Sequence, residues 1–411
     1  IRIATIINNE MQENGSQLLT NNEVVNIRSK AKEILVSLEK ELNVDAHKSP
    51  EELESNYHNS WLNGPVSVVG VSNLCRYLDS FGFLHIPSFA SSDEVEAMKQ
   101  QMLDLIQDWD PSSEGTVTFS TKECDNEAQG SDDYFLESAS RVHFFAEPDA
   151  VDPDASRLKE EFKDTIKTPQ NKVMALNKSG HALHTIPGPF QDYTISDKVK
   201  SLVHELGWKD PIVPQSMYIC KNPKIGGTVH SHQDSTFLYT EPRQSCLGLW
   251  LALDPANLHN GCLWVRPKSH HEPVRRQFRR NVAHFSQSII DERSNCGVGD
   301  TTQPKMIFQV HPPHNDAPSI PWEGSLPDGS EPPCEGLLQA GFVPIECQAG
   351  DLLAFVGQLD HLSLPNYSDD QRHTFQLHLV EGPEAGVEWS KYNWLQYPKG
   401  KDFVSLKLNS L

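Results

Sequence analysis

The sequence predicts an α+β protein in which helices come first and short strands then build a barrel or jelly-roll core. Two features of the pattern predict this. Apolar residues recur at helical spacing early in the chain, and from about residue 211 they form short or alternating runs instead. Gly, Pro and Asn separate those runs. Short strands after a helical start are typical of this fold class.

The first predicted helix covers residues 22–43. We expect its apolar face to pack on the main domain, with binding of a partner protein as the alternative. The residues before it, 1–21, are polar and are expected to be loose. The apolar residues of the helix are Val24, Ile27, Ala31, Ile34, Leu35, Leu38 and Leu42.

A helix, a strand and a second helix are predicted next. The helix over 71–80 leads into a short buried strand over 81–87. Ser91 and Glu94 have the spacing of a capping box, which opens another helix. Pro111 prevents that helix from continuing.

The strand pattern follows a short helix predicted over 198–206. Asn260-Gly261 is a strong turn signal between two of the strands. Residues 303–334 contain eight prolines, and Pro at that density is excluded from a central sheet. We therefore predict a long surface loop there. The predicted strands are 211–219, 245–253, 262–266, 350–356 and 372–380.

Composition excludes several classes of partner. The 411-residue chain has a net charge of −21, which repels phosphate backbones, so no nucleic-acid partner is expected. The eight cysteines form no CxxC pair, and we expect reduced thiols in an intracellular protein. No apolar run reaches about 18 residues, so no membrane span is expected. The chain does not end in the peroxisomal signal Ser-Lys-Leu, which favours a cytoplasmic location.

The motif His232-Gln233-Asp234 indicates a metal site. In a strand, residues two apart point to the same face, so one imidazole and one carboxylate converge. A second His from elsewhere in the chain completes a set of three ligands, two imidazoles and one carboxylate. On one face of an octahedron, these ligands leave three coordination positions open. Non-haem Fe(II) suits that set, because 2-oxoglutarate takes two positions and O2 takes the third. A structural zinc site is instead closed by four ligands, usually with Cys.

Other histidines compete for a place in this site. A second HxD begins at His314, but it lies in the Pro-rich loop, which offers no rigid strand. His230 lies beside the first motif and is a decoy or a supporting group. The candidates for the second imidazole are His361, His373 and His378. We favour His361 as the second imidazole, because it follows an apolar run that is predicted to be a strand.

Arg372 follows His361 by eleven residues and begins an alternating strand. A buried Arg requires an anionic partner, and the far carboxylate of 2-oxoglutarate supplies one, because a guanidinium can hold it through two parallel hydrogen bonds. The alternative is a solvated Arg372, or one paired with Asp369 or Asp370. The polar face of this strand consists of Arg372, Thr374, Gln376 and His378.

A basic stretch interrupts the acidic chain. It is interpreted as a solvated face that balances nearby acidic residues, or as an anchor for an anionic substrate group such as the phosphates of an acyl-CoA. The residues are Arg266, Lys268, Arg275, Arg276, Arg279 and Arg280.

Several stretches together resemble the phytanoyl-CoA dioxygenase family. The resemblance runs from about residue 74 to residue 397, so it is more specific than a single motif. The stretches that carry it are Phe81-Gly82-Phe83-Leu84, Gly180-His181-Ala182-Leu183-His184, Gln215-Ser216-Met217-Tyr218-Ile219, His232-Gln233-Asp234, Asn260-Gly261-Cys262-Leu263-Trp264, His361 with Arg372, and Asn393-Trp394-Leu395-Gln396.

The resemblance implies a double-stranded β-helix, or jelly-roll, enzyme that uses Fe(II) and 2-oxoglutarate, with flanking N-terminal helices. The residues that match the iron ligands of the family are His232, Asp234 and His361. Arg372 matches the residue that holds the 2-oxoglutarate carboxylate. Other cosubstrate contacts are matched by Lys178, Met217 and Trp250. Without the resemblance, the last two are typical of ordinary core positions.

The expected organisation is an N-terminal extension over 1–70 and a dioxygenase domain over 71–400. A Pro-rich insertion is expected at about 285–345, and Lys268 stands where the family usually has Gly. The expected partner is a small-molecule substrate, anionic or an acyl-CoA, and ascorbate joins Fe(II) and 2-oxoglutarate among the expected cofactors. The alternatives are a catalytically silent binding protein that retains the metal site and a zinc hydrolase.

Overall fold

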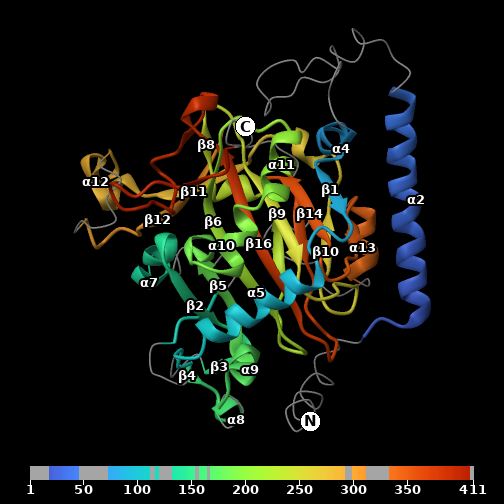
Figure 1. The fold of residues 1–411 in the computed structure, drawn as a ribbon, viewed down its shortest axis with the longest axis horizontal. Coiled ribbons are helices and arrows are strands. Elements are labelled where there is room, and N and C mark those ends of the chain that lie inside the picture. Colours follow the sequence, from blue (N-terminus) through green and yellow to red (C-terminus); the bar gives the residue numbers. More distant parts are fainter. Residues whose placement is uncertain are drawn as a thin grey trace.

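The computed structural model describes residues 18–45, 73–111, 116–119, 132–152, 157–163, 167–291, 299–311 and 333–407. Two antiparallel sheets dominate this part of the chain (Figure 1). The larger sheet has the strand order β1 (Phe83–Ile86), β14 (Leu352–Val356), β9 (Leu247–Ala252), β16 (Arg372–Glu381), β6 (Pro211–Lys221), β5 (Leu176–His181) and β2 (Val142–Ala146), with β18 (Val404–Ser405) also paired to β6. The smaller sheet has the order β13 (Val343–Ile345), β10 (Leu263–Val265), β15 (His361–Ser363) and β7 (Val229–His232).

The chain crosses repeatedly between the two sheets. Strands β6, β9, β14 and β16 belong to the large sheet, and β7, β10, β13 and β15 belong to the small sheet. Along the chain these strands alternate between the two sheets except at β10 and β13, which follow each other in the small sheet. This alternation is that of a double-stranded β-helix, so the predicted jelly-roll core is confirmed. Strands β9 and β14 are buried along their whole length, which explains why they appear in the sequence as continuous apolar runs.

Helices cover one face of the large sheet (Figure 1). Helix α5 (Ser92–Leu105) begins at the predicted capping box, in which Ser91 Oγ accepts from Glu94 N and Ser91 N donates to the Glu94 carboxylate. Helix α10 (Pro189–Thr194) packs on the sheet through Phe190, whose ring centroid lies 4.8 Å from that of Phe375 on β16. Helices α4 (Asn73–Phe81) and α11 (Asp197–Glu205) agree with the predicted positions.

Helix α2 (Asn21–Asp45) lies along one edge of the molecule, as the long blue helix in Figure 1. Val24, Ile27 and Ala31 are buried in the main apolar core. Arg28 donates to the carboxylate of Glu346 over 2.7 Å. The helix packs on the main domain, as expected. The expected domain boundary after residue 70 lies outside the described residues.

Part of the Pro-rich region forms regular secondary structure. Strand β12 (Met306–Val310) lies within the predicted loop and pairs with β11 (Arg276–Arg280), with Phe308 opposite Phe278. The ring centroids of these two residues are 5.0 Å apart, so apolar packing stabilises the hairpin. The prediction of a continuous loop is therefore wrong at 306–310. Helix α13 (Pro333–Gln339) also lies in the expected insertion.

The remaining described α-helices and strands are short. They are β3 (Val151–Asp152), β4 (Arg157–Leu158), β8 (Thr240–Glu241), β17 (Glu388–Trp389), α7 (Asp133–Glu137), α8 (Glu160–Lys163), α9 (Pro169–Lys172) and α12 (Val282–Asp291). Lys268 has a φ of 69°, a left-handed conformation that favours Gly. None of the described helices combines the length and apolar character needed to cross a membrane.

Candidate metal centre

Two neighbouring strands of the small sheet position the histidines of the predicted metal site. His232 is the last residue of β7, and His361 is the first residue of β15. These residues lie opposite each other in an antiparallel pair, with ring centroids 4.3 Å apart. Strand β7 ends at His232, and Asp234, two residues later, begins a short 3-10 turn. The expectation that the whole HxD motif lies in one strand is therefore wrong, although the turn directs the carboxylate to the same point.

The three side chains lie close enough to bind one ion. Asp234 Oδ1 is 3.4 Å from His232 Nε2 and 3.7 Å from His361 Nε2. One ligand atom of each residue lies within 4.8 Å of the other two. Metal–ligand bonds of roughly 2.0–2.2 Å fit a triangle of this size. Two imidazoles and one carboxylate, without Cys, form the donor set that suits non-haem Fe(II).

Backbone carbonyls set the tautomers of both imidazoles. His232 Nδ1–H donates to the carbonyl of His230 over 2.8 Å, and His361 Nδ1–H donates to the carbonyl of Leu359 over 3.0 Å. Both Nε2 lone pairs are therefore free to face a metal ion. Burial, together with the nearby His232, lowers the pKa of His361 to about 4, so this imidazole is neutral near pH 7.

Asp234 is a carboxylate at neutral pH. Burial opposes its ionisation, but the neighbouring histidines, above all His378 and His361, hold the pKa of Asp234 well below its usual range. Burial opposes protonation of His232, but its contacts with Asp234 raise its pKa above the usual value. The site therefore offers one negative charge from Asp234 and a neutral nitrogen from His361. A divalent cation held by these three residues would compensate that buried charge.

Arg372 lies in the same cavity and has two unused donors. The residue is 2% exposed, and its Nε and Nη1 atoms are buried without a hydrogen-bond partner. Within the described part of the chain it forms no ion pair with Asp369 or Asp370, and Asp369 instead lies 3.3 Å from Lys224 Nζ. Burial lowers the pKa of Arg372 to about 10, so the guanidinium remains charged near pH 7. A buried cation of this kind requires an anionic ligand.

Lys178, Met217 and Trp250 also line this cavity, from strands β5, β6 and β9. Lys178 is buried, with Nζ 3.2 Å from the ring centroid of Phe119 and 3.2 Å from His181 Nε2. Burial lowers the pKa of Lys178 well below its usual range. The positions that the family resemblance singled out are therefore brought together with the three candidate ligands.

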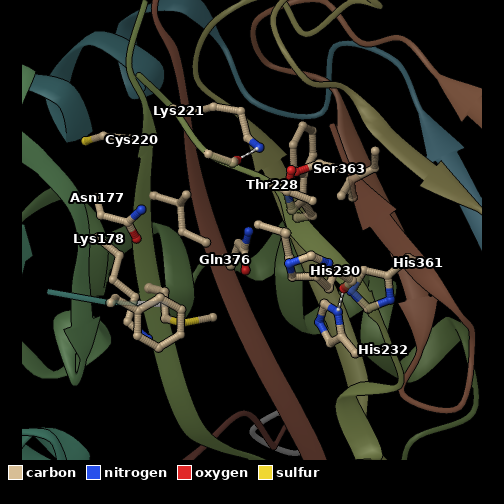
Figure 2. Close-up of a pocket in the computed structure, with 18 of the residues that line it drawn as sticks. Asn177, Lys178, Cys220, Lys221, Thr228, His230, His232, His361, Ser363 and Gln376 are labelled. Atoms are coloured by element: carbon tan, nitrogen blue, oxygen red, sulfur yellow. Dashed lines mark hydrogen bonds between the residues drawn. The ribbon is translucent and has the colours of Figure 1, made fainter. Parts of the chain in front are cut away.

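The cavity has a volume of about 660 Å³. Figure 2 shows His232 and His361 in one corner, with Lys178 and Asn177 entering from the opposite wall and Gln376 between them. Much of the remaining wall is aromatic. The aromatic residues that line it are Phe119, Phe135, Phe237, Trp250, Phe278, Phe355, Tyr367 and Trp394.

Comparison with known proteins identifies the family. The phytanoyl-CoA dioxygenase (PhyH) family model matches residues 78–374. The chain belongs to this family. It is 38% identical over 323 residues to a phytanoyl-CoA dioxygenase of Arabidopsis thaliana, covering 79% of this chain and 92% of that protein. It is 36% identical over 316 residues to phytanoyl-CoA dioxygenase domain-containing protein 1 of Mus musculus, covering 77% of this chain and 91% of that protein.

Membership of the phytanoyl-CoA dioxygenase family makes the chain a non-haem iron dioxygenase that depends on 2-oxoglutarate. Among solved structures, the non-haem α-ketoglutarate-dependent carbocyclase SnoK aligns with a TM-score of 0.44 at 14% identity, over 84% of this chain and 100% of that chain. The assignment of the fold rests on the strand order described above.

The other candidate histidines occupy different positions. His378 contacts the triad, with Nε2 3.1 Å from Asp234 Oδ2. His373 faces away from the cavity and lies 3.0 Å from the Tyr218 hydroxyl. His230 lines the cavity beside the triad (Figure 2). The second HxD, at His314, lies outside the described residues.

The basic stretch does not act as one surface. Arg275 lies 2.5 Å from the carboxylate of Asp360, and Arg266 also pairs with Asp360. The expectation that Arg275 anchors a substrate is therefore wrong, because a buried acidic partner already compensates its charge. Of the six residues, only Arg276 lines the cavity. Its guanidinium carbon lies 4.3 Å from the ring centroid of Phe308.

Sequence reasoning missed Ser363 as a site residue. Its Oγ is buried without a hydrogen-bond partner, and the residue lines the cavity (Figure 2). Ser363 follows His361 by two positions on β15, so both side chains share one face of the strand. The two-residue spacing from His361 was therefore a signal in the sequence that could have predicted Ser363.

Proposed function

We propose that the protein hydroxylates a small organic or acyl substrate, with consumption of 2-oxoglutarate and O2 and release of succinate and CO2. The observation that carries the proposal is the buried guanidinium of Arg372, whose Nε and Nη1 have no partner in the described part of the chain, in the same cavity as His232, Asp234 and His361. A metal triad alone is compatible with several chemistries. A triad together with an unsatisfied buried Arg fits a ligand that is both a chelator and a carboxylate.

In this proposal, His232, Asp234 and His361 hold Fe(II) and leave three positions open. Iron supplies the activation of O2 and the oxidation of a C–H bond when it is bound. The protein holds the reactants in place and excludes water. The aromatic cavity wall provides a largely apolar environment for this purpose.

Arg372 binds the far carboxylate of 2-oxoglutarate, and this role is supported by its buried Nε and Nη1, which have no hydrogen-bond partner within the described part of the chain. Ser363 Oγ offers a further hydrogen bond. Trp250 and Met217 form walls of the cosubstrate site, and Lys178 supplies a buried donor. These assignments are supported by the shared cavity and by the match with the family.

The proposed substrate is largely apolar and carries an anionic group. The aromatic residues of the wall favour an apolar body, and Arg276 on β11 provides a cation at the same cavity. An acyl-CoA and a free organic acid both have this chemistry. Ascorbate is proposed as an auxiliary reductant that keeps the iron in the Fe(II) state, and the cytoplasm is the proposed location.

The proposal is tested by succinate release. Purified protein with Fe(II), 2-oxoglutarate and ascorbate is mixed with acyl-CoAs, free acids and small metabolites, and succinate is measured with and without each compound. We expect at least one compound to stimulate succinate formation, and His232→Ala to abolish the stimulation. His204→Ala, on helix α11 and outside the cavity lining, serves as a histidine control.

Three outcomes contradict the proposal. Full activity of His232→Ala would show that His232 is not a metal ligand. Tight binding of Fe(II) and 2-oxoglutarate without succinate formation for any compound favours a catalytically silent binding protein. Hydrolysis of a substrate by a zinc-loaded sample favours a hydrolase instead.

A further inference from the structure

A buried histidine contacts the oxygen of Asp234 that faces away from the other two candidate ligands. His378 is 3% exposed, and its Nε2 lies 3.1 Å from Asp234 Oδ2. The other carboxylate oxygen, Oδ1, is the one that lies 3.4 Å from His232 Nε2 and 3.7 Å from His361 Nε2. The two oxygens of this carboxylate therefore have different surroundings.

The direction of the hydrogen bond follows from the chemistry of its partners. A carboxylate only accepts, so Nε2 of His378 carries the proton and donates it to Oδ2. Nδ1 of His378 lies 3.2 Å from Nε2 of the Gln215 side chain. The amide of Gln215 therefore donates to Nδ1, which fixes the imidazole in the tautomer that donates to Asp234.

Three adjacent strands of the large sheet, β6, β16 and β9, carry the residues of this arrangement at paired positions. Gln215 on β6 and Gly248 on β9 both lie directly opposite His378 on β16. A Cβ atom at Gly248 would lie 3.3 Å from Asp234 Oδ2 and 2.8 Å from the ring of Phe355. Glycine at this position therefore gives the carboxylate the space to approach the sheet closely.

We propose that His378 is a positioning residue that engages Oδ2 of Asp234 and so makes this carboxylate a one-oxygen ligand. The inference rests on the proposed function. If both oxygens of Asp234 bound iron, they would fill one of the three positions that 2-oxoglutarate and O2 require. The hydrogen bond from His378 keeps that position open, and Gln215 holds His378 in place.

The test compares two variants that differ in one donor. His378→Leu removes the donor, whereas His378→Gln retains an amide N–H near the position of Nε2. Fe(II) dissociation constants are measured anaerobically on the full chain, without turnover. Loss of a group that orients a metal ligand typically weakens metal binding by roughly 10- to 100-fold. We expect a loss of that size in His378→Leu and a value within a few-fold of wild type in His378→Gln.

A second readout reports the coordination itself. The visible spectrum of the Co(II)-substituted protein depends on the number of ligands. We expect this spectrum to change in His378→Leu and to remain close to that of wild type in His378→Gln. Gln215→Leu keeps the His378 side chain but removes the amide that fixes its tautomer and orientation, so an intermediate loss of Fe(II) affinity is expected. This variant tests the inference independently if His378→Leu does not fold.

The outcomes separate the two proposals. Wild-type Fe(II) affinity and an unchanged Co(II) spectrum in His378→Leu overturn the role of His378 and leave the proposed function standing. An equal loss in His378→Leu and His378→Gln also overturns it, because a merely structural role predicts that result. Failure of the wild-type protein to bind Fe(II) overturns both proposals.

Discussion

At the scale of single residues, the site is defined by groups that the fold leaves unsatisfied. Arg372 and Ser363 are both buried. Within the described part of the chain, Arg372 Nε, Arg372 Nη1 and Ser363 Oγ have no hydrogen-bond partner. Leaving such donors unpaired costs about 1–3 kcal/mol each. A ligand that satisfies them recovers that free energy on binding, which is why the proposed cosubstrate site is placed here.

Arg372→Lys tests this placement. Lysine keeps the charge but cannot hold a carboxylate through two parallel hydrogen bonds. Loss of a charge-assisted hydrogen bond of about 1.5–3 kcal/mol predicts a KM for 2-oxoglutarate raised roughly 10- to 100-fold. Fe(II) affinity is expected to stay near the wild-type value, and steady-state kinetics provides the measurement.

Arg279→Lys on β11 is the matched control, because Arg279 stacks on Tyr392 and does not line the cavity. An unchanged KM for 2-oxoglutarate in Arg372→Lys contradicts the assigned role.

At the scale of elements, the strands predicted from the sequence include the apolar strands and the alternating strand β16, but not β5, β7 or β15. Strands β9 and β14 are buried on both faces and have continuous apolar runs. Strands β5, β7 and β15 contain Lys, Ser and His, because their side chains face the cavity and the metal site. A strand that lines a polar cavity loses the apolar period by which strands are recognised. The triad itself was predictable, because its residue types and spacing remain in the sequence.

The capping box of helix α5 gives a prediction at this scale. Ser91→Ala removes the hydroxyl that accepts from Glu94 N, and such a change costs about 1 kcal/mol. We expect a lower Tm in thermal unfolding, with Fe(II) affinity unchanged. Ser92→Ala, at the first position of the same helix, is the control and should leave the Tm near that of wild type. Equal Tm values for both variants would show that the cap does not stabilise the fold.

At the scale of the whole molecule, the folded core holds ionisable groups that couple stability to pH. Burial raises the pKa of Asp79 in α4 to about 7, whereas an exposed Asp titrates near about 3.9. The folded chain therefore binds this proton more tightly than the unfolded chain. The resulting stabilisation is fully present below about pH 4 and is lost as the pH rises through about 7, at up to about 1.4 kcal/mol per pH unit.

Asp79→Asn removes this titration. We expect the Tm of the wild-type protein to fall between about pH 5 and pH 7, and the Tm of Asp79→Asn to fall less over the same interval. Asp93→Asn, an exposed position on α5, is the control and should retain the wild-type slope. Parallel curves for wild type and Asp79→Asn would mean that Asp79 does not set the pH dependence.

The central claim is that His232, Asp234 and His361 bind Fe(II) in the cavity where Arg372 binds 2-oxoglutarate. The most direct test is the visible absorption of the anaerobic protein mixed with Fe(II) and 2-oxoglutarate, because a 2-oxo acid that chelates Fe(II) gives a charge-transfer band. The account predicts this band in the wild-type protein, its loss in Asp234→Ala, and its appearance only at higher 2-oxoglutarate concentration in Arg372→Lys. Absence of the band from the folded wild-type protein, or its undiminished presence in Asp234→Ala, would contradict the account.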